Sequence, residues 1–252
     1  MDRWIHGVNA VLEALRADPA KIARVVVAAG RGDARVREVQ QAARQAGVPV
    51  TSQPAVAIDR LAGLGVSHQG VVALLQEVGW ADADDALARA PSPALLVVLD
   101  GVDDPRNLGA VIRAAAAAGA GAVFVPEHRS AGLSPVCIKA SAGAVFRIPV
   151  ARIGNVAAFL RTLKERGVWI AGLDPEGAPL WGGFDLREPL ALVLGGEGKG
   201  LRRLTREHCD VLLALPLAPG IESLNLAVAA GVALYETVRQ RHQKVLHPKE
   251  IV

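Results

Sequence analysis

The sequence predicts an α/β protein with two domains, and three observations support this prediction. The chain has 252 residues, 51% of them apolar, which is enough to bury one large or two small cores. From Ala94 onward, short runs that are apolar throughout alternate with helical patterns, as in a parallel sheet covered on both faces. Residues 80–93 are acidic, rich in alanine and ended by two prolines, which is typical of a linker carrying a short helix. We therefore predict a domain over residues 1–78, a linker over residues 79–93 and a second domain over residues 94–252.

The N-terminal domain is predicted to be a small mixed α/β unit. Apolar residues recur at helical spacing in two stretches, and β-branched or apolar runs mark three strands. Gly47 provides a stop signal for the second helix. The expected elements are helices over Gly7–Arg16 and Ala34–Ala46, and strands over Arg24–Ala28, near Val48–Val50 and over Gly70–Leu75.

The C-terminal domain repeats a pattern of an apolar strand followed by a helix. Its last helix is apolar almost all round through Ala233, as a buried helix would be. Open α/β sheets build ligand sites beyond the carboxyl ends of their strands, so the loops there are the candidate functional segments. The expected strands are Leu95–Leu99, Ala122–Val125, Val168–Ala171, Leu190–Leu194 and Val211–Ala214, and the expected helices are Asn107–Ala118, Val156–Arg166 and Leu224–Arg241.

Composition excludes several classes of protein. The formal charge of +3 and a pI near 9.1 permit a polyanionic partner without requiring one. Only two cysteines occur, with neither a Cys-x-x-Cys pair nor a histidine cluster, so we predict no disulfide framework and no metal. The N-terminus lacks the apolar run of a signal peptide, and no stretch approaches the roughly 18 apolar residues of a membrane span. We expect a soluble, cytoplasmic protein without membrane contact.

The glycine-rich segment Leu194–Leu201 resembles a nucleotide loop but fits no nucleotide template. Lys199 is followed by glycine rather than by Ser or Thr, and the glycine spacing differs from that of the dinucleotide fingerprint, which disfavours an oxidoreductase. A carboxylate at Glu197 would also repel a pyrophosphate. A cationic or neutral ligand such as S-adenosylmethionine fits better, because bare glycine backbone allows close approach. The alternative is a tight turn without a ligand.

Two further segments place polar side chains where an apolar strand stops. In Leu215–Asn225, Ser223 is well placed as the N-cap of the final helix, whereas Asn225 is an amide in an apolar helix and needs a partner. Asn107 begins another helix, as a plain N-cap or as part of a site. Arg113 follows in an alanine-rich run that is too apolar for an ordinary solvated face.

Together the three segments resemble the motifs of the SPOUT superfamily, in its SpoU branch of RNA ribose 2'-O-methyltransferases. Ile5–Leu15 and Ser67–Ala73 resemble the L30e-like substrate-binding domain of that branch, and Glu197–Cys209 is similar to a member that methylates a guanosine of bacterial 23S rRNA. The resemblance covers essentially the whole chain. It implies an L30e-like N-terminal domain and a C-terminal SPOUT domain with a deep trefoil knot.

The resemblance also implies an activity, a methyl donor and partners. We expect S-adenosylmethionine-dependent methylation of a guanosine ribose in 23S rRNA by a homodimer, and no activity on DNA, which lacks the 2'-hydroxyl. The alternatives are a tRNA 2'-O-methyltransferase and a non-catalytic rRNA-binding or ribosome-assembly protein. By carry-over of the motifs, the catalytic positions are Asn107, Arg113, Glu197, Ser223 and Asn225, and the cofactor positions are Gly195, Gly196, Leu215, Leu217, Ile221 and Leu224.

The expected mechanism does not use Arg113 as a base. Guanidinium is effectively never neutral in proteins, so it cannot accept the proton of the 2'-hydroxyl. We expect Arg113 instead to bind a neighbouring phosphate or to stabilise the developing alkoxide. Asn107 and Ser223 would orient the ribose, and Glu197 would organise the arginine. The group that accepts the proton stays open.

Overall fold

The computed structural model describes residues 4–30, 33–63, 65–75, 79–181, 183–196, 198 and 200–242. The chain forms two compact units. Unit 1 contains Met1–Gly79 and the internal segment Gly132–Arg147, and unit 2 contains Trp80–Ala131 and Ile148–Val252. The α/β class predicted from the sequence is confirmed.

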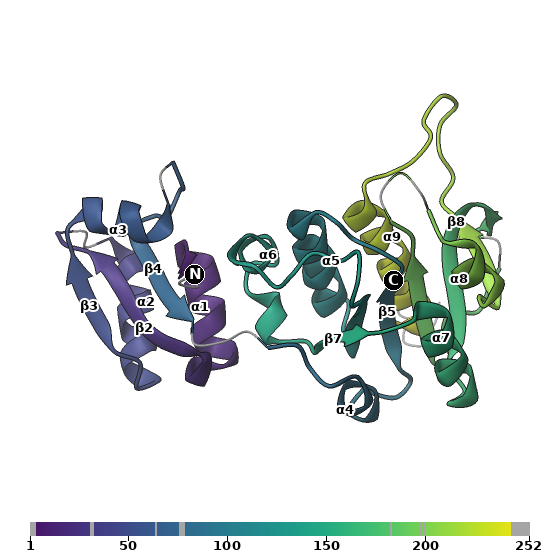
Figure 1. Ribbon diagram of the computed structural model, residues 1–252, viewed down its shortest axis with the longest axis horizontal. Helices are drawn as coiled ribbons and strands as arrows, with labels where there is room; N and C mark the ends of the chain where they lie inside the picture. Colours follow the sequence, from purple (N-terminus) through teal and green to yellow (C-terminus); the bar gives the residue numbers. More distant parts are fainter. Residues whose placement is uncertain are drawn as a thin grey trace, which may run out of the picture. The chain divides into compact units, whose positions relative to one another are not determined.

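Unit 1 is built on a mixed sheet with the strand order β1-β4-β2-β3 (Figure 1). β4 runs antiparallel to both of its neighbours, whereas β2 and β3 are parallel. Val25, Val26 and Val72 are fully buried in the sheet. The strands are β1 (Trp4–His6), β2 (Ile22–Ala28), β3 (Val50–Gln53) and β4 (Val71–Leu75), and the helices along the chain are α1 (Val8–Ala17), the 3-10 turn η1 (Pro19–Lys21), α2 (Ala34–Gln45) and α3 (Ala55–Ala62).

The internal segment of unit 1 lies between two strands of unit 2 in the sequence. It contains α6 (Pro135–Ala140) and the 3-10 turn η2 (Ala144–Phe146), which contact β1 and α1 respectively. Arg147 Nε donates to Glu13 Oε2 at 2.6 Å, which fixes the end of the segment on α1. We predicted residues 94–252 as one domain, and this segment is the exception, since a stretch of chain that packs with another unit leaves no local sequence pattern.

Unit 2 is built on a six-stranded, wholly parallel sheet with the order β10-β8-β9-β5-β6-β7. The strand order reverses between β9 and β5, which is the switch point where such sheets form ligand sites. All five residues of β5, β6 and β9 are buried. The strands are β5 (Leu95–Leu99), β6 (Ala122–Pro126), β7 (Val150–Ile153), β8 (Trp169–Pro179), β9 (Leu190–Leu194) and β10 (Val211–Ala214).

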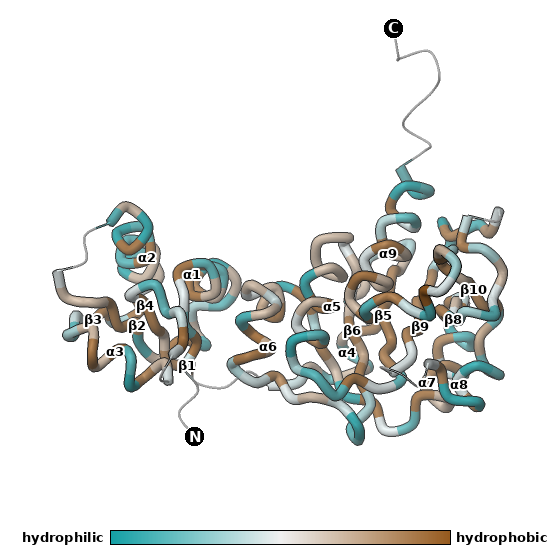
Figure 2. The backbone as a smooth tube through the Cα atoms, turned by 90° about the horizontal axis from the view of Figure 1, so that it is seen from above, coloured by the Kyte–Doolittle hydropathy of each residue, from teal (hydrophilic) through white to brown (hydrophobic). Residues whose placement is uncertain are grey.

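Helices cover both faces of this sheet (Figure 2). Leu96 and Val98 point to one face and pack in a cluster with residues of α4 and α7, while α5 and α9 pack together on the opposite face. None of the helices in the described part of the chain is both long and apolar enough to span a bilayer. The helices are α4 (Ala83–Ala88), α5 (Pro105–Ala117), α7 (Val156–Glu165), α8 (Arg203–Glu207) and α9 (Leu226–His242).

Residues 79–93, which the sequence analysis assigned to a linker, are in part built into unit 2. The backbone N–H of Ala81 donates to Val150 O at 2.9 Å, which adds a bridge beside β7. Ala86 of α4 is 2% exposed and belongs to the core cluster of the sheet. The composition of α4 explains the difference, because a short helix whose only large apolar residue is Leu87 gives a weak sequence signal and still packs closely.

Candidate functional site

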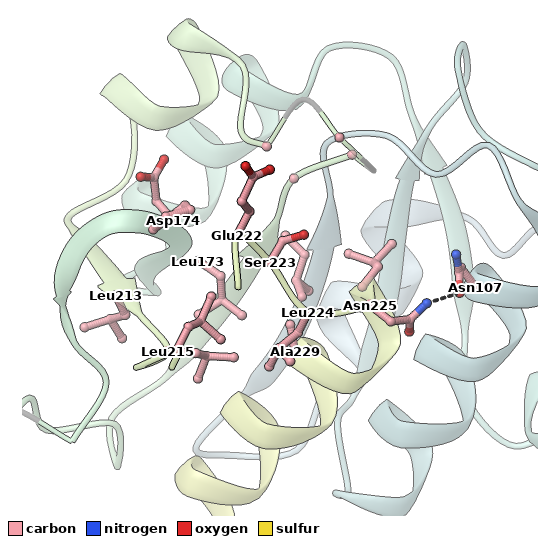
Figure 3. Close-up of a pocket in the computed structure, with 18 residues that line it drawn as sticks. Asn107, Leu173, Asp174, Leu213, Leu215, Glu222, Ser223, Leu224, Asn225 and Ala229 are labelled. Atoms are coloured by element: carbon pink, nitrogen blue, oxygen red, sulfur yellow. Dashed lines mark hydrogen bonds between the residues drawn. The ribbon is translucent and has the colours of Figure 1, made fainter. Parts of the chain in front are cut away.

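A pocket of about 560 Å³ lies at the carboxyl ends of β8, β9 and β10, beside the start of α9 (Figure 3). Leu173, Leu194 and Leu213 line it from the three strands. The loop after β9 and the chain between β10 and α9 supply most of the other walls. The pocket therefore lies at the edge of the parallel sheet that the sequence analysis selected for its candidate segments.

Asn225 joins two of the three motif segments at the edge of this pocket. Its Oδ1 accepts hydrogen bonds from the backbone N–H groups of Ala227 at 3.0 Å and Val228 at 3.3 Å, so Asn225 is the N-cap of α9. Its Nδ2 donates to Asn107 Oδ1 at 2.9 Å (Figure 3). The expectation that Ser223 caps this helix is wrong, because α9 begins at Leu226, two residues later than predicted.

Asn107 lies in the first turn of α5 and lines the pocket. The N-cap of α5 is Asp104, whose Oδ1 accepts from the backbone N–H of Arg106 at 2.8 Å. Pro105 occupies the first helical position, where a missing N–H costs nothing. The interpretation of Asn107 as a plain N-cap is therefore wrong, and its side chain instead forms part of the pocket wall.

Arg113 does not line the pocket, and its side chain is exposed on α5. The expectation that it avoids a solvated face is wrong for the single chain. The apolar residues around it are mostly alanines on the outer face, whereas the buried face of α5 carries Leu108, Val111 and Ile112. Seven residues are close to two helical turns, so Arg106 and Arg113 share one exposed stripe.

The glycine-rich loop after β9 closes on itself. Gly196 and Gly200 exchange two backbone hydrogen bonds of 3.1 Å each. A Cβ atom on Gly195 would lie 2.1 Å from the carbonyl carbon of Gly200, so only glycine fits there. Gly195 and Gly196 both line the pocket, as predicted for cofactor positions. Glu197, predicted to be catalytic, lies outside the described residues.

The remaining predicted positions divide into those that line the pocket and those that do not. Ser223 and Asn225 line it, as do Leu215, Leu217 and Leu224. Ile221 does not line it and is 55% exposed. The structure thus brings most of the predicted positions to one cavity, while their roles stay predictions.

β8 also contributes to the pocket, which was not predicted from the sequence. Leu173 and Asp174 line the pocket, but the predicted strand ended at Ala171. The signal was present, because Asp174 and Pro175 follow directly on an apolar run and so mark the end of the buried part of β8 that pairs with β9. This is the pattern that selected the other three segments.

Two carboxylates, Asp174 and Glu222, line one end of the pocket. Asp174 is 8% exposed, and its Oδ1 accepts from the backbone N–H of Glu176 at 2.9 Å and lies 3.4 Å from Arg206 Nη2. The side-chain hydrogen bond to Glu176 raises the pKa of Arg206, so this guanidinium stays charged beside Asp174. Figure 3 shows Asp174 and Glu222 at the same end of the pocket, with leucines gathered at the other. Such a cavity suits a ligand that is partly cationic and partly apolar.

Comparison with known proteins identifies relatives of both units. The model of the SpoU rRNA methylase family matches residues 94–235, and the model for RNA 2'-O ribose methyltransferase substrate binding matches residues 4–79. The 23S rRNA (guanosine-2'-O-)-methyltransferase RlmB of Xylella fastidiosa is 46% identical over 95% of this chain and 97% of its own length.

Solved structures of similar proteins extend the comparison to the fold. The SpoU methyltransferase AviRb from Streptomyces viridochromogenes, in complex with its cofactor AdoMet, superposes with a TM-score of 0.78 at 26% identity over 95% of this chain and 90% of that one. The AdoMet-bound rRNA methyltransferase from Sinorhizobium meliloti gives a TM-score of 0.73 at 27% identity over 98% and 88%. The resemblance found in the sequence is confirmed, and the chain belongs to the SpoU rRNA methylase family.

Proposed function

We propose that this chain transfers a methyl group from S-adenosylmethionine to the ribose 2'-oxygen of a guanosine in bacterial 23S rRNA. The relative from Xylella fastidiosa bears this activity in its name and matches both units. The observation within the molecule that carries the proposal is the hydrogen bond between Asn225 and Asn107. It joins segments 118 residues apart in the sequence at the wall of one pocket.

The pocket suits S-adenosylmethionine in size and in chemistry. A cavity of about 560 Å³ falls within the range of small-molecule sites. Its leucines offer apolar walls for an adenine ring, and the carboxylates of Asp174 and Glu222 would attract the positively charged sulfonium and ammonium groups. We propose that backbone groups of Gly195, Leu215 and Leu224 hold the cofactor, with Gly196, Leu217 and the exposed Ile221 beside them.

The bound cofactor would supply a methyl group on a positively charged sulfur, and the chain would position the acceptor oxygen for in-line attack. Asn107 and Ser223 are proposed to orient the ribose, with Asn225 holding Asn107 in place. Arg113 is proposed to bind a neighbouring phosphate or the developing alkoxide, with Glu197 organising it.

A second copy of this chain is the proposed partner of α9. Val228 and Tyr235 are 51% and 52% exposed, and Leu224 just before the helix is 40% exposed. Positions 228 and 235 are close to two helical turns apart, so Val228 and Tyr235 lie on one side of α9 and form an exposed apolar stripe. An apolar stripe on an otherwise packed helix favours an interface between copies.

Two alternative functions are less well supported than methylation of 23S rRNA. A tRNA 2'-O-methyltransferase is disfavoured because the match to RlmB spans the N-terminal unit as well as the catalytic one. A non-catalytic rRNA-binding protein is disfavoured by the retained polar positions in the pocket. Because rRNA is the proposed substrate, we propose that the protein works in the cytoplasm.

Methyl transfer to defined nucleic acids tests the proposal. The purified chain is incubated with methyl-labelled S-adenosylmethionine and with unmodified 23S rRNA, a tRNA mixture or the DNA version of the rRNA target. We expect label at one guanosine 2'-oxygen of the rRNA and none in DNA. Label in tRNA alone would favour the first alternative. Absence of cofactor binding by calorimetry, with RNA present, would reject the proposal.

A further inference from the structure

Arg129 and Arg202 come from different loops and both lie against Gly101, beside the carboxyl end of β5, Arg129 through its backbone and Arg202 through its side chain. A Cβ atom on Gly101 would lie 3.4 Å from Arg202 Nη2 and 3.6 Å from the backbone oxygen of Arg129. The backbone N–H of Val102 donates to that oxygen at 3.1 Å. Both arginine side chains are exposed. The guanidinium of Arg202 and the backbone of Arg129 thus both lie against Gly101 at the ligand-binding edge of the sheet, and the exposed side chain of Arg129 starts from this place.

This point adjoins the pocket. A Cβ atom on Gly196, which lines the pocket, would lie 3.6 Å from the carbonyl oxygen of Gly101. Gly101 therefore lies between the cavity on one side and the Arg202 guanidinium and the Arg129 backbone on the other. A nucleotide whose ribose enters the pocket mouth would bring its flanking phosphates to this neighbourhood.

Arg202 is held in place by a buried carboxylate. Asp100 is 2% exposed, and its Oδ2 accepts from the backbone N–H of Arg202 at 2.6 Å. Its Oδ1 lies 3.6 Å from Arg202 Nη1 and has no hydrogen-bond partner among the described residues. A buried carboxylate that is only partly satisfied needs its cation nearby, so Asp100 restricts where the guanidinium lies. Because Arg202 has further N–H groups, it still has donors to offer a ligand.

Arg129 shows a second sign of a constrained site. Its φ angle is 63°, in the left-handed region that non-glycine residues rarely adopt. The adjacent Ser130 Oγ is buried and also lacks a hydrogen-bond partner among the described residues. No acidic side chain of the described chain forms an ion pair with Arg129, whereas Arg187 and Arg203 each pair with an acid within four positions.

We propose that Arg129 and Arg202 form a clamp for an RNA phosphate next to the methylated nucleotide. The inference rests on the proposed function and assigns part of its RNA contact. Guanidinium groups match phosphate geometry and keep their charge, which makes them suited to this task. Asp104, an acidic neighbour, is engaged in capping α5, and Asp100 is paired with Arg202 itself. Asp103 and Glu127 are exposed acidic residues of the same two loops that carry Gly101 and Arg129.

The test compares Arg129→Gln and Arg202→Gln with Arg187→Gln as the matched control. Arg187 lies before the amino end of β9, at the opposite edge of the sheet, and pairs with Asp185 at 2.6 Å. The affinity for transcribed 23S rRNA is measured by filter binding at salt concentrations from about 50 to about 200 mM, because the slope of log affinity against log salt reports the number of phosphate contacts. Affinity for S-adenosylmethionine is measured by calorimetry on the same samples.

We expect each clamp variant to bind rRNA about three- to tenfold more weakly and to lower the slope of log affinity against log salt by about one. Cofactor affinity and the control should not change. Unchanged rRNA affinity and slope in both clamp variants would overturn the inference. Arg129→Gln removes no ion pair, so it keeps the test valid if Arg202→Gln disturbs the fold.

The same measurements separate this inference from the proposed function. If the wild-type chain methylates rRNA and the clamp variants match it in binding and slope, the clamp is wrong and the proposed function stands. If the wild-type chain transfers no methyl group while the clamp variants still lose rRNA affinity, the proposed function is wrong and the phosphate site stands.

Discussion

The side chain of Asn225 makes two separate contacts, one with the start of α9 and one with Asn107. Its oxygen caps α9, and its amide nitrogen holds Asn107 at the pocket wall. The two tasks are separable because serine is also a good N-cap but is too short to reach Asn107. Asn225→Ser should therefore keep the stability of the wild type, whereas Asn225→Ala should lose about 1 kcal/mol in urea unfolding.

The activity of these variants should follow the other contact. We expect both Asn225→Ser and Asn225→Ala to lower kcat/KM for rRNA methylation by at least about tenfold, because a small misplacement of the acceptor costs that much. Asn107→Ala, which leaves the cap intact, should behave like the serine variant. Wild-type kcat/KM in Asn225→Ser would show that the link to Asn107 has no part in the reaction.

Substitutions at Arg113 can show whether its role depends on the shape of the guanidinium group or only on its positive charge. Lysine preserves the positive charge but lacks the planar fork that binds phosphate in a bidentate manner. We expect Arg113→Lys to lose turnover at saturating rRNA nearly as much as Arg113→Gln, measured as methyl transfer per site. Turnover of Arg113→Lys close to that of the wild type would contradict positioning by the fork.

At the scale of elements, α9 has one face in the core and one face without a described partner. Ala230, Ala233 and Leu234 are buried, whereas Val228 and Tyr235 are about half exposed. If a second copy covers the outer face, a charge there would have to be desolvated without a counter-ion. We expect Val228→Lys to shift the chain to a monomer in sedimentation velocity. Val56→Lys, at a 61% exposed valine of α3, is the control and should not change the mass. A wild-type chain that sediments as a monomer would reject the dimer.

The elements that could be predicted from the sequence are those with an unbroken pattern. β5 and β9 are five-residue apolar runs, and they match the predicted bounds. β8 runs to Pro179, far past its predicted end, through Gly172, Pro175 and Gly177, which ordinarily interrupt strands. Gly177 is accepted because β10 approaches so closely that a Cβ atom there would lie 2.5 Å from the backbone of Leu212. Such a contact depends on a strand some 35 residues away along the chain, and local patterns cannot reveal it.

Across the whole molecule, the loops that form the candidate site could be predicted from the sequence, whereas the contribution of β8 and the role of each capping residue could not. Polar residues at strand ends and the glycine-rich segment identified most of the pocket, and the family resemblance supplied roles for them. The sequence could not show that Asn225 rather than Ser223 is the N-cap of α9, because serine and asparagine cap helices equally well. The exposure of Arg113 was missed because an alanine-rich run reads as apolar whether or not it is covered.

The division into two units predicts where the cofactor stabilises the chain. The pocket is lined by residues of unit 2 alone, so S-adenosylmethionine should stabilise the native state of that unit. At a concentration near 100 times its Kd, the gain is about 2.7 kcal/mol. In hydrogen exchange, amides of β8, β9, β10 and α9 should exchange more slowly with the cofactor, while amides of β2 and β4 in unit 1 keep their rates. S-adenosylhomocysteine serves as a second ligand without the transferable methyl group. Equal slowing in both units would show that they unfold as one, and no slowing around the pocket would place the cofactor elsewhere.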